Sequence, residues 1–199
     1  MEVIWLVFTI VSYFLFALVA LVDKYVIKGG YIPSAKIYAF YVCLSSVFAL
    51  FLIPLGFYIP SAYDIALSLL AGAVIVFGLF AFYTGLQHFE ASRFVPAFGG
   101  FLPLFTFAFS YYLSPEKFLG KTEIIAFILL VLGSVLISLG QKTKVAQGLL
   151  RMAIITAFLF SANLVLAKLV FLNQPFWSGF IWMRIGAVLI APFFLIFKE

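Results

Sequence analysis

The sequence is poor in the residues that most enzymes and metal proteins depend on. It has one cysteine and one histidine in 199 residues, so an internal disulfide and a cysteine-based metal site are excluded. It also has no HExxH or GxSxG motif and no clustered pair of carboxylates, the patterns typical of common hydrolases. We therefore expect no enzymatic activity, no cofactor and no bound metal.

Charge is scarce as well. Only 10% of the residues are charged, against roughly 25% in a typical soluble domain. Hydrophobic residues make up 66% of the chain, including 27 Phe, and the mean hydropathy is +1.26. A chain this short cannot bury so much apolar surface in water, which predicts an integral membrane protein with the lipid bilayer as its first partner. The net charge of +5 is spread singly between apolar runs, as in loops at an anionic membrane face, so we expect no nucleic acid.

The apolar residues fall into seven long segments separated by turn and charge residues. A helix needs about 20 mainly apolar residues to cross the hydrocarbon core, and these runs lack the alternation of a β-barrel strand. The N-terminus has no basic residue before its first apolar run, which favours a retained helix over a cleaved signal peptide. We expect an all-α membrane protein of about seven transmembrane helices. The expected segments are Val3–Val22, Ile37–Phe57, Ile65–Gln87, Phe94–Leu113, Ile124–Leu139, Leu149–Phe171 and Trp177–Phe197.

A weak internal repeat appears when the sequence is shifted by 144 positions. The shift places Lys24 on Lys168 and Ser34 on Ser178. Because five helices are an odd number, a second copy would enter the membrane from the opposite side, giving the inverted repeat of many secondary transporters. We expect a first five-helix unit at 1–140, a linker at 141–148 and the first two helices of a second unit at 149–199. The chain would then be 5+2 helices of a 5+5 fold, a truncated ten-helix protein, with a genuine seven-helix protein as the alternative.

Four motifs resemble one family of transporters. They are Glu90-Ala91-Ser92-Arg93, Pro103-Leu104-Phe105-Thr106, Glu116-Lys117 and the small-residue helix Ile124–Leu139. Together they are similar to the first unit of the EamA-like drug/metabolite transporters, which commonly read ASR…PLFT…GE(R/K) here, and the resemblance covers essentially the whole chain. Arg184 matches an arginine often found early in the second helix of a unit. Pro115 stands where the family usually has Gly, and Phe40 occupies the position equivalent to Arg184 in the first unit.

The resemblance implies a secondary transporter that takes up or exports a small polar or amphipathic metabolite by alternating access. It also implies a multi-pass protein of a bacterial or archaeal plasma membrane and leaves a homodimer open. The orientation stays undecided, because the family usually has a cytoplasmic N-terminus, whereas the basic residues gather on the side that would place the N-terminus outside.

Arg184 is the first candidate for the substrate path. It lies in the body of an apolar segment, where a charged side chain costs about 2.5–3.5 kcal/mol on insertion scales and needs a partner or a wet cavity. We interpret it as a cavity cation that meets an anionic group of the substrate. The alternative is an arginine that reaches the nearer interface.

Charged and polar residues at two joints are further candidates. Glu90 and Arg93, with Gln87 and His88 just before them, could form a gate at one mouth of the path; an interfacial ion pair with little net stability is the favoured alternative. We also consider three gate residues, Asp23, Lys24 and Lys168. Asp23 and Lys24 could form a salt bridge with the Glu90 cluster that locks a closed state, although snorkelling at helix ends would explain both lysines.

The fourth segment contains Pro96, Gly99, Gly100 and Pro103. Each proline removes an amide hydrogen bond, and the glycines permit a distorted backbone. An interrupted helix at membrane depth is a pointer to a binding site in an inverted-repeat transporter. We therefore place these four residues on the substrate path, with a tolerated kink as the alternative.

Small residues recur at seven-residue spacing in two segments, and each trio lines one face of its helix. The trios are Ala71, Gly78 and Gly85, and Ala126, Gly133 and Gly140. Their expected use is close helix packing. A protein that used such faces only to recruit other helices would be a non-transporting membrane module, which is the alternative to a transporter.

Overall fold

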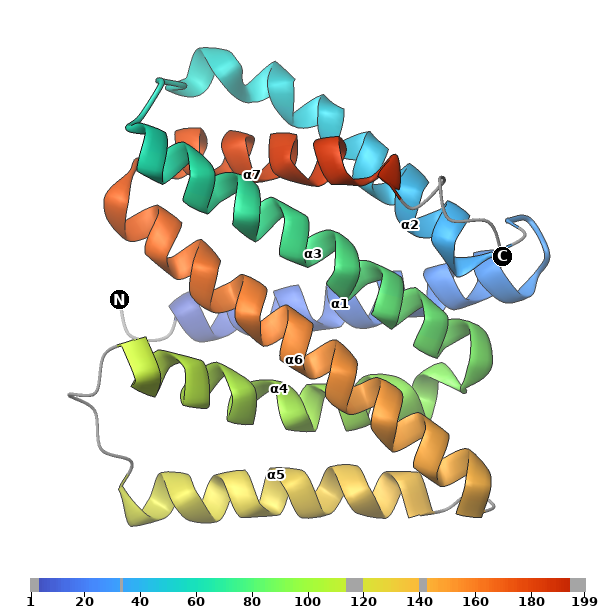
Figure 1. Cartoon of the computed structure of the whole chain (residues 1–199). Coiled ribbons are helices and arrows are strands. Elements are labelled where there is room, and N and C mark those ends of the chain that lie inside the picture. Colours follow the sequence, from blue (N-terminus) through green and yellow to red (C-terminus); the bar gives the residue numbers. More distant parts are fainter. Residues whose placement is uncertain (1–3, 33, 114–119, 140–142, 194–199) are drawn as a thin grey trace.

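The structure is a computed structural model that describes residues 4–32, 34–113, 120–139 and 143–193. These residues form helices and no strand; η1 continues the course of α2, and the other consecutive helices run in alternate directions through the bundle (Figure 1). The elements are α1 (Ile4–Lys28), α2 (Ala35–Leu44), the 3-10 helix η1 (Ser45–Leu55), α3 (Ala62–His88), α4 (Ala91–Leu113), α5 (Lys121–Leu139), α6 (Thr143–Asn173) and α7 (Phe176–Ile190).

Five helical stretches of the described chain are long and apolar enough to cross a membrane. They are Leu6–Lys28, Ala35–Leu55, Ala62–His88, Ala91–Leu113 and Val145–Asn173. The expectation of an all-α protein with several membrane-spanning helices is therefore confirmed. The apolar helices Ile124–Gly133 and Phe176–Ile190 are shorter, so the count of seven spanning helices stays a prediction.

Helix α1 is longer than the sequence pattern predicts. It continues past Val22 to Lys28, because lysine is a good helix former and its charged end can reach the interface. The helix stops where Gly29 and Gly30 follow, and Gly30 has a φ of +76°, a conformation that glycine adopts without strain.

Two other expected boundaries differ from the structure. Helix α6 begins at Thr143, so most of the expected linker at 141–148 is helix. The second expected segment divides into α2 and η1, which has Pro54 inside it and ends at Gly56 with a φ of 132°.

The sequence predicted an interrupted fourth helix, but α4 is continuous. It runs as one helix from Ala91 to Leu113 through Pro96 and Pro103. Side chains support its backbone beside the second proline: Thr106 Oγ1 and Ser161 Oγ donate to the carbonyl of Leu102 at 2.9 and 2.8 Å. Thr106 belongs to α4 itself, whereas Ser161 comes from the neighbouring helix α6, and bonds of both kinds help a membrane helix to continue through proline.

Helices α3 and α6 form the centre of the bundle. Helix α6 crosses α3 and α4, and α3 also packs along α7 (Figure 1). Aromatic rings fill the centre: the Phe82 ring centroid lies 5.8 Å from that of Phe98 and 6.0 Å from that of Phe160. By contrast, most side chains of α1 are exposed, as expected of a surface that lipid covers.

Candidate functional site

A cleft of about 330 Å³ lies between α3, α6 and α7. Most of its wall is apolar, and its two strongly polar side chains are Asn163 from α6 and Arg184 from α7. Its lining residues are Ile75, Asn163, Ala167, Phe171, Phe176, Phe180, Met183 and Arg184. An apolar wall with a few convergent polar groups is the usual form of a small-molecule site.

Arg184 is half-buried in this cleft. It lies eight residues after the start of α7 at Phe176, which is about 12 Å along the helix axis. Its guanidinium carbon sits 4.8 Å from the ring centroid of Phe180, a cation–π contact within the cleft. Within the ranges that the structure describes, Arg184 forms no ion pair.

Asn163 faces the same cleft from the body of α6. Its side-chain nitrogen donates to the carbonyl of Ala71 on α3 at 2.8 Å. This bond fixes the amide on the cleft wall near Arg184. Guanidinium groups bind carboxylates through two parallel hydrogen bonds, so the cleft can hold a small anion whose apolar part packs on Phe176 and Phe180.

The predicted mouth residues form local contacts around the α3–α4 joint. Arg93 Nε lies 3.3 Å from Glu90 Oε2, and the two side chains are 35% and 65% exposed. An ion pair with this much exposure to solvent contributes little stability. His88 Nδ1 donates to the carbonyl of Thr84 at 2.9 Å. Gln87 accepts a hydrogen bond from the amide of Ala35 at 3.3 Å. The Glu90–Arg93 contact fits the alternative of an interfacial ion pair, and the Gln87 bond joins the end of α3 to the start of α2.

Asp23 and Lys24 do not form the expected salt bridge with this joint. Lys24 Nζ instead donates to the carbonyls of Leu86 and Phe89, the latter at 2.6 Å. These contacts attach α1 to the C-terminal end of α3, where a cation satisfies carbonyls that have no amide partner. Asp23 Oδ1 accepts a hydrogen bond from the Tyr38 hydroxyl at 2.5 Å. Lys168 is exposed on α6.

The candidate residues of α4 lie away from the cleft that contains Arg184. Pro96, Gly99 and Gly100 line an apolar groove of about 580 Å³ between α4 and α5, together with Ala126, Leu129, Leu130 and Gly133. Pro103 is half-buried one turn beyond Gly99. The described residues that line this groove carry no charge.

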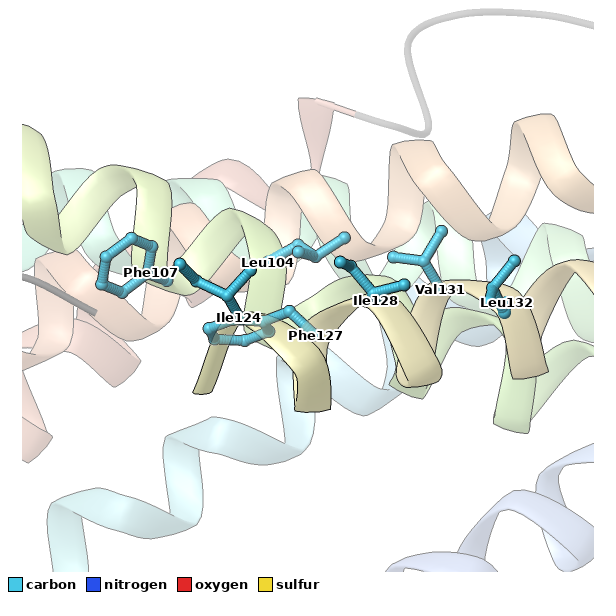
Figure 2. A pocket seen from close by; sticks show the side chains of 7 residues that line it. All are labelled: Leu104, Phe107, Ile124, Phe127, Ile128, Val131 and Leu132. Atoms are coloured by element: carbon cyan, nitrogen blue, oxygen red, sulfur yellow. The ribbon is translucent and has the colours of Figure 1, made fainter. Parts of the chain in front are cut away.

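A second groove between the same helices is also apolar. Figure 2 shows the side chains that line about 340 Å³ of space along α5: Leu104, Phe107, Ile124, Phe127, Ile128, Val131 and Leu132. These branched and aromatic side chains are apolar, as expected for a surface that the acyl chains of a bilayer cover. The Glu116–Lys117 pair of the fourth joint lies outside the described residues.

Three polar side chains beside the candidate residues were not predicted from the sequence. They are Asn163 beside Arg184, Tyr38 beside Asp23, and Tyr83, whose ring centroid lies 4.6 Å from that of Tyr38. A signal existed for Asn163, since an amide within an apolar membrane segment is costly unless it is bonded. The tyrosines gave none, because tyrosine is also common at membrane interfaces.

No protein-family model matches the chain, and no curated protein or solved structure matches it either.

Proposed function

We propose that the protein is a secondary transporter of the drug/metabolite type, and that it moves a small amphipathic metabolite with an anionic group by alternating access. The observation that carries the proposal is Arg184, a cation without an ion-pair partner in the described chain, half-buried in a cleft among α3, α6 and α7. The resemblance of its motifs to the EamA-like transporters supports the same assignment.

The energetics of a membrane explain why Arg184 points to function. An arginine near the middle of a membrane helix costs about 2.5–3.5 kcal/mol on insertion scales. A structural arginine would recover this cost through a carboxylate on a neighbouring helix, and among the described residues none pairs with it. A substrate carboxylate would supply that partner transiently, which is what a carrier needs to bind and release its cargo.

The proposed architecture is the inverted repeat. In it, α6 and α7 would correspond to α1 and to α2 with η1, since Lys24 and Lys168 occupy equivalent positions. The lysines have different surroundings, because Lys24 caps carbonyls whereas Lys168 is exposed. Such differences between repeats are expected of a transporter that is open to one side at a time.

The test is to measure the flux of radiolabelled small carboxylates, and of matched neutral analogues, in proteoliposomes that contain the purified protein. We expect saturable flux of at least one carboxylate, lost in Arg184→Ala. Arg151→Ala is the matched control, because Arg151 is an exposed arginine on α6, and it should keep the flux. Equal flux in Arg184→Ala and the unmodified protein would remove Arg184 from the site.

A non-transporting membrane module is the second candidate, and one observation favours it. A β-carbon built on Gly99 or on Gly133 would have no neighbour within 4 Å, so these glycines on α4 and α5 leave room for another helix. In that case, no compound of the panel would move, and disulfide crosslinking of Gly133→Cys variants would join two copies in the bilayer.

A further inference from the structure

Asp23 is a carboxylate inside a membrane-spanning helix, away from the cleft of Arg184. It is 6% exposed and lies five residues before the end of α1 at Lys28, which is about 7.5 Å along the helix axis. An ionisable residue at such a position is a functional-site hypothesis by default.

The Asp23 carboxylate accepts a hydrogen bond but has no ion-pair partner among the described residues. The Tyr38 hydroxyl donates to Asp23 Oδ1 at 2.5 Å. The adjacent Lys24 is engaged by the carbonyls of Leu86 and Phe89, and no ion pair of Asp23 occurs in the described ranges. One phenol satisfies only part of the hydrogen-bonding capacity of an ionised carboxylate. Binding a proton is therefore the direct way to remove the buried charge.

We propose that Asp23 is a proton-binding site, and that its protonation accompanies substrate binding in the transport cycle. The reaction is the addition of one proton to a carboxylate oxygen, which changes the side-chain charge from −1 to 0 with no transfer of electrons. Tyr38 then has no anion to stabilise, so the link between α1 and α2 weakens. The coupling part of this inference rests on the proposed function, whereas the protonation itself does not.

A series of neighbouring side chains runs from Asp23 toward Arg184. Tyr38 of α2 touches Tyr83 of α3 ring edge to ring face, and Tyr83 lies within electrostatic range of Asp23, Tyr38 and Cys43. Cys43 in turn lies within electrostatic range of Arg184. In the proposed cycle, coupling between Asp23 and Arg184 would run along these side chains of α2 and α3.

The other titratable groups near the site are known from the structure. Tyr38 and Tyr83 face Asp23 from α2 and α3, and Lys24 follows it on α1. Lys28 and Glu90 lie within electrostatic range of Lys24. A carboxyl band that disappears when Asp23 alone is substituted is therefore assigned to Asp23 and not to Glu90.

The test is infrared difference spectroscopy of the purified protein in lipid nanodiscs during a pH titration, with protons as the only ligand. We expect a C=O stretching band of a protonated carboxyl that is lost in Asp23→Asn and kept in the control Asp64→Asn. Asp64 lies at the start of α3, next to the cap residue Ser61. At a given pH, Tyr38→Phe should increase the protonated fraction, because the ionised form loses its donor.

An Asp23 band that is absent over the whole titration, or unchanged by Asp23→Asn, would overturn the proton site. If Asp23→Asn does not fold, Tyr38→Phe decides by the same band, and no change in protonated fraction would contradict the inference. Proton uptake with carboxylate flux in proteoliposomes then tests the coupling, which Asp23→Asn should abolish. Absence of all flux with an intact Asp23 band would contradict the transporter and leave the proton site standing.

Discussion

Gly72 of α3 and Gly186 of α7 meet backbone to backbone where the two helices cross. A β-carbon built on Gly72 would lie 2.9 Å from the Cα atom of Gly186 and 2.1 Å from the carbonyl oxygen of Met183. No flexible side chain separates the helices at this point. The crossing therefore requires glycine, and it positions α7, which carries Arg184, against α3.

Gly72→Ala should lower the free energy of unfolding. The added methyl group would force two backbones apart, and overpacking of this kind typically costs about 1–3 kcal/mol. Gly133→Ala is the matched control, because its β-carbon meets nothing within 4 Å and alanine favours helix by about 1 kcal/mol. Thermal unfolding in detergent, followed by circular dichroism, compares the two. An unchanged melting temperature in Gly72→Ala would mean that the helices do not touch there.

Gly85 and Phe94 provide a test of the α3–α4 contact. A β-carbon on Gly85 would lie 2.1 Å from Phe94 Cζ, and Phe94 is fully buried. Gly85→Ala should therefore destabilise the protein, and much less so in a Phe94→Leu background, with an interaction energy of about 0.5–3 kcal/mol. Purely additive effects in the double-mutant cycle would contradict the contact.

Lys24→Met should loosen the α3–α4 joint. Methionine keeps an unbranched apolar stem close in length to that of lysine but leaves the carbonyls of Leu86 and Phe89 without their donor, at a cost of about 1–3 kcal/mol. Lys28→Met is the control, because Lys28 is exposed. Faster amide hydrogen exchange at the end of α3 in Lys24→Met alone would support the assignment, and equal exchange in both variants would contradict it.

Ligand binding gives a prediction for Arg184 that does not depend on transport. A carboxylate that binds the cleft should raise the melting temperature, since a ligand at 100 times its Kd stabilises by about 2.7 kcal/mol. Arg184→Gln should abolish this shift. Arg184→Lys should keep only part of it, because an ammonium group cannot pair in bidentate fashion. A full shift in Arg184→Gln would place the ligand elsewhere.

The sequence predicted the helical class and most helix positions, because apolar runs flanked by charge follow directly from the cost of exposing polar groups to lipid. It did not predict that α1 would extend to Lys28, since a lysine near a helix end does not terminate the helix. It also predicted that Pro96 and Pro103 would interrupt α4, which is continuous. Prolines remove amide donors, but bonds from other helices, such as that from Ser161, determine whether a membrane helix breaks.

The candidate site was predictable only in part. Arg184 stood out because a charge in an apolar segment is costly. Its neighbour Asn163, and the pairing of Asp23 with Tyr38, depend on how each helix is rotated about its own axis, which packing between helices sets. Two residues fifteen positions apart on different helices have no pattern in the sequence that would connect them.

Helix α6 supplies Leu149, Ala153 and Ala157 to the same buried cluster as Phe82 and Phe94. The ribosome releases α3 and α4 well before it completes α6, so the nascent chain holds their inner faces in the membrane without a partner for many seconds of synthesis. Bonds inside α4 must then preserve its shape through two prolines before Ser161 arrives. Assembly of the centre is therefore a late event of biogenesis. Until then, lipid or insertion factors occupy the place that α6 takes.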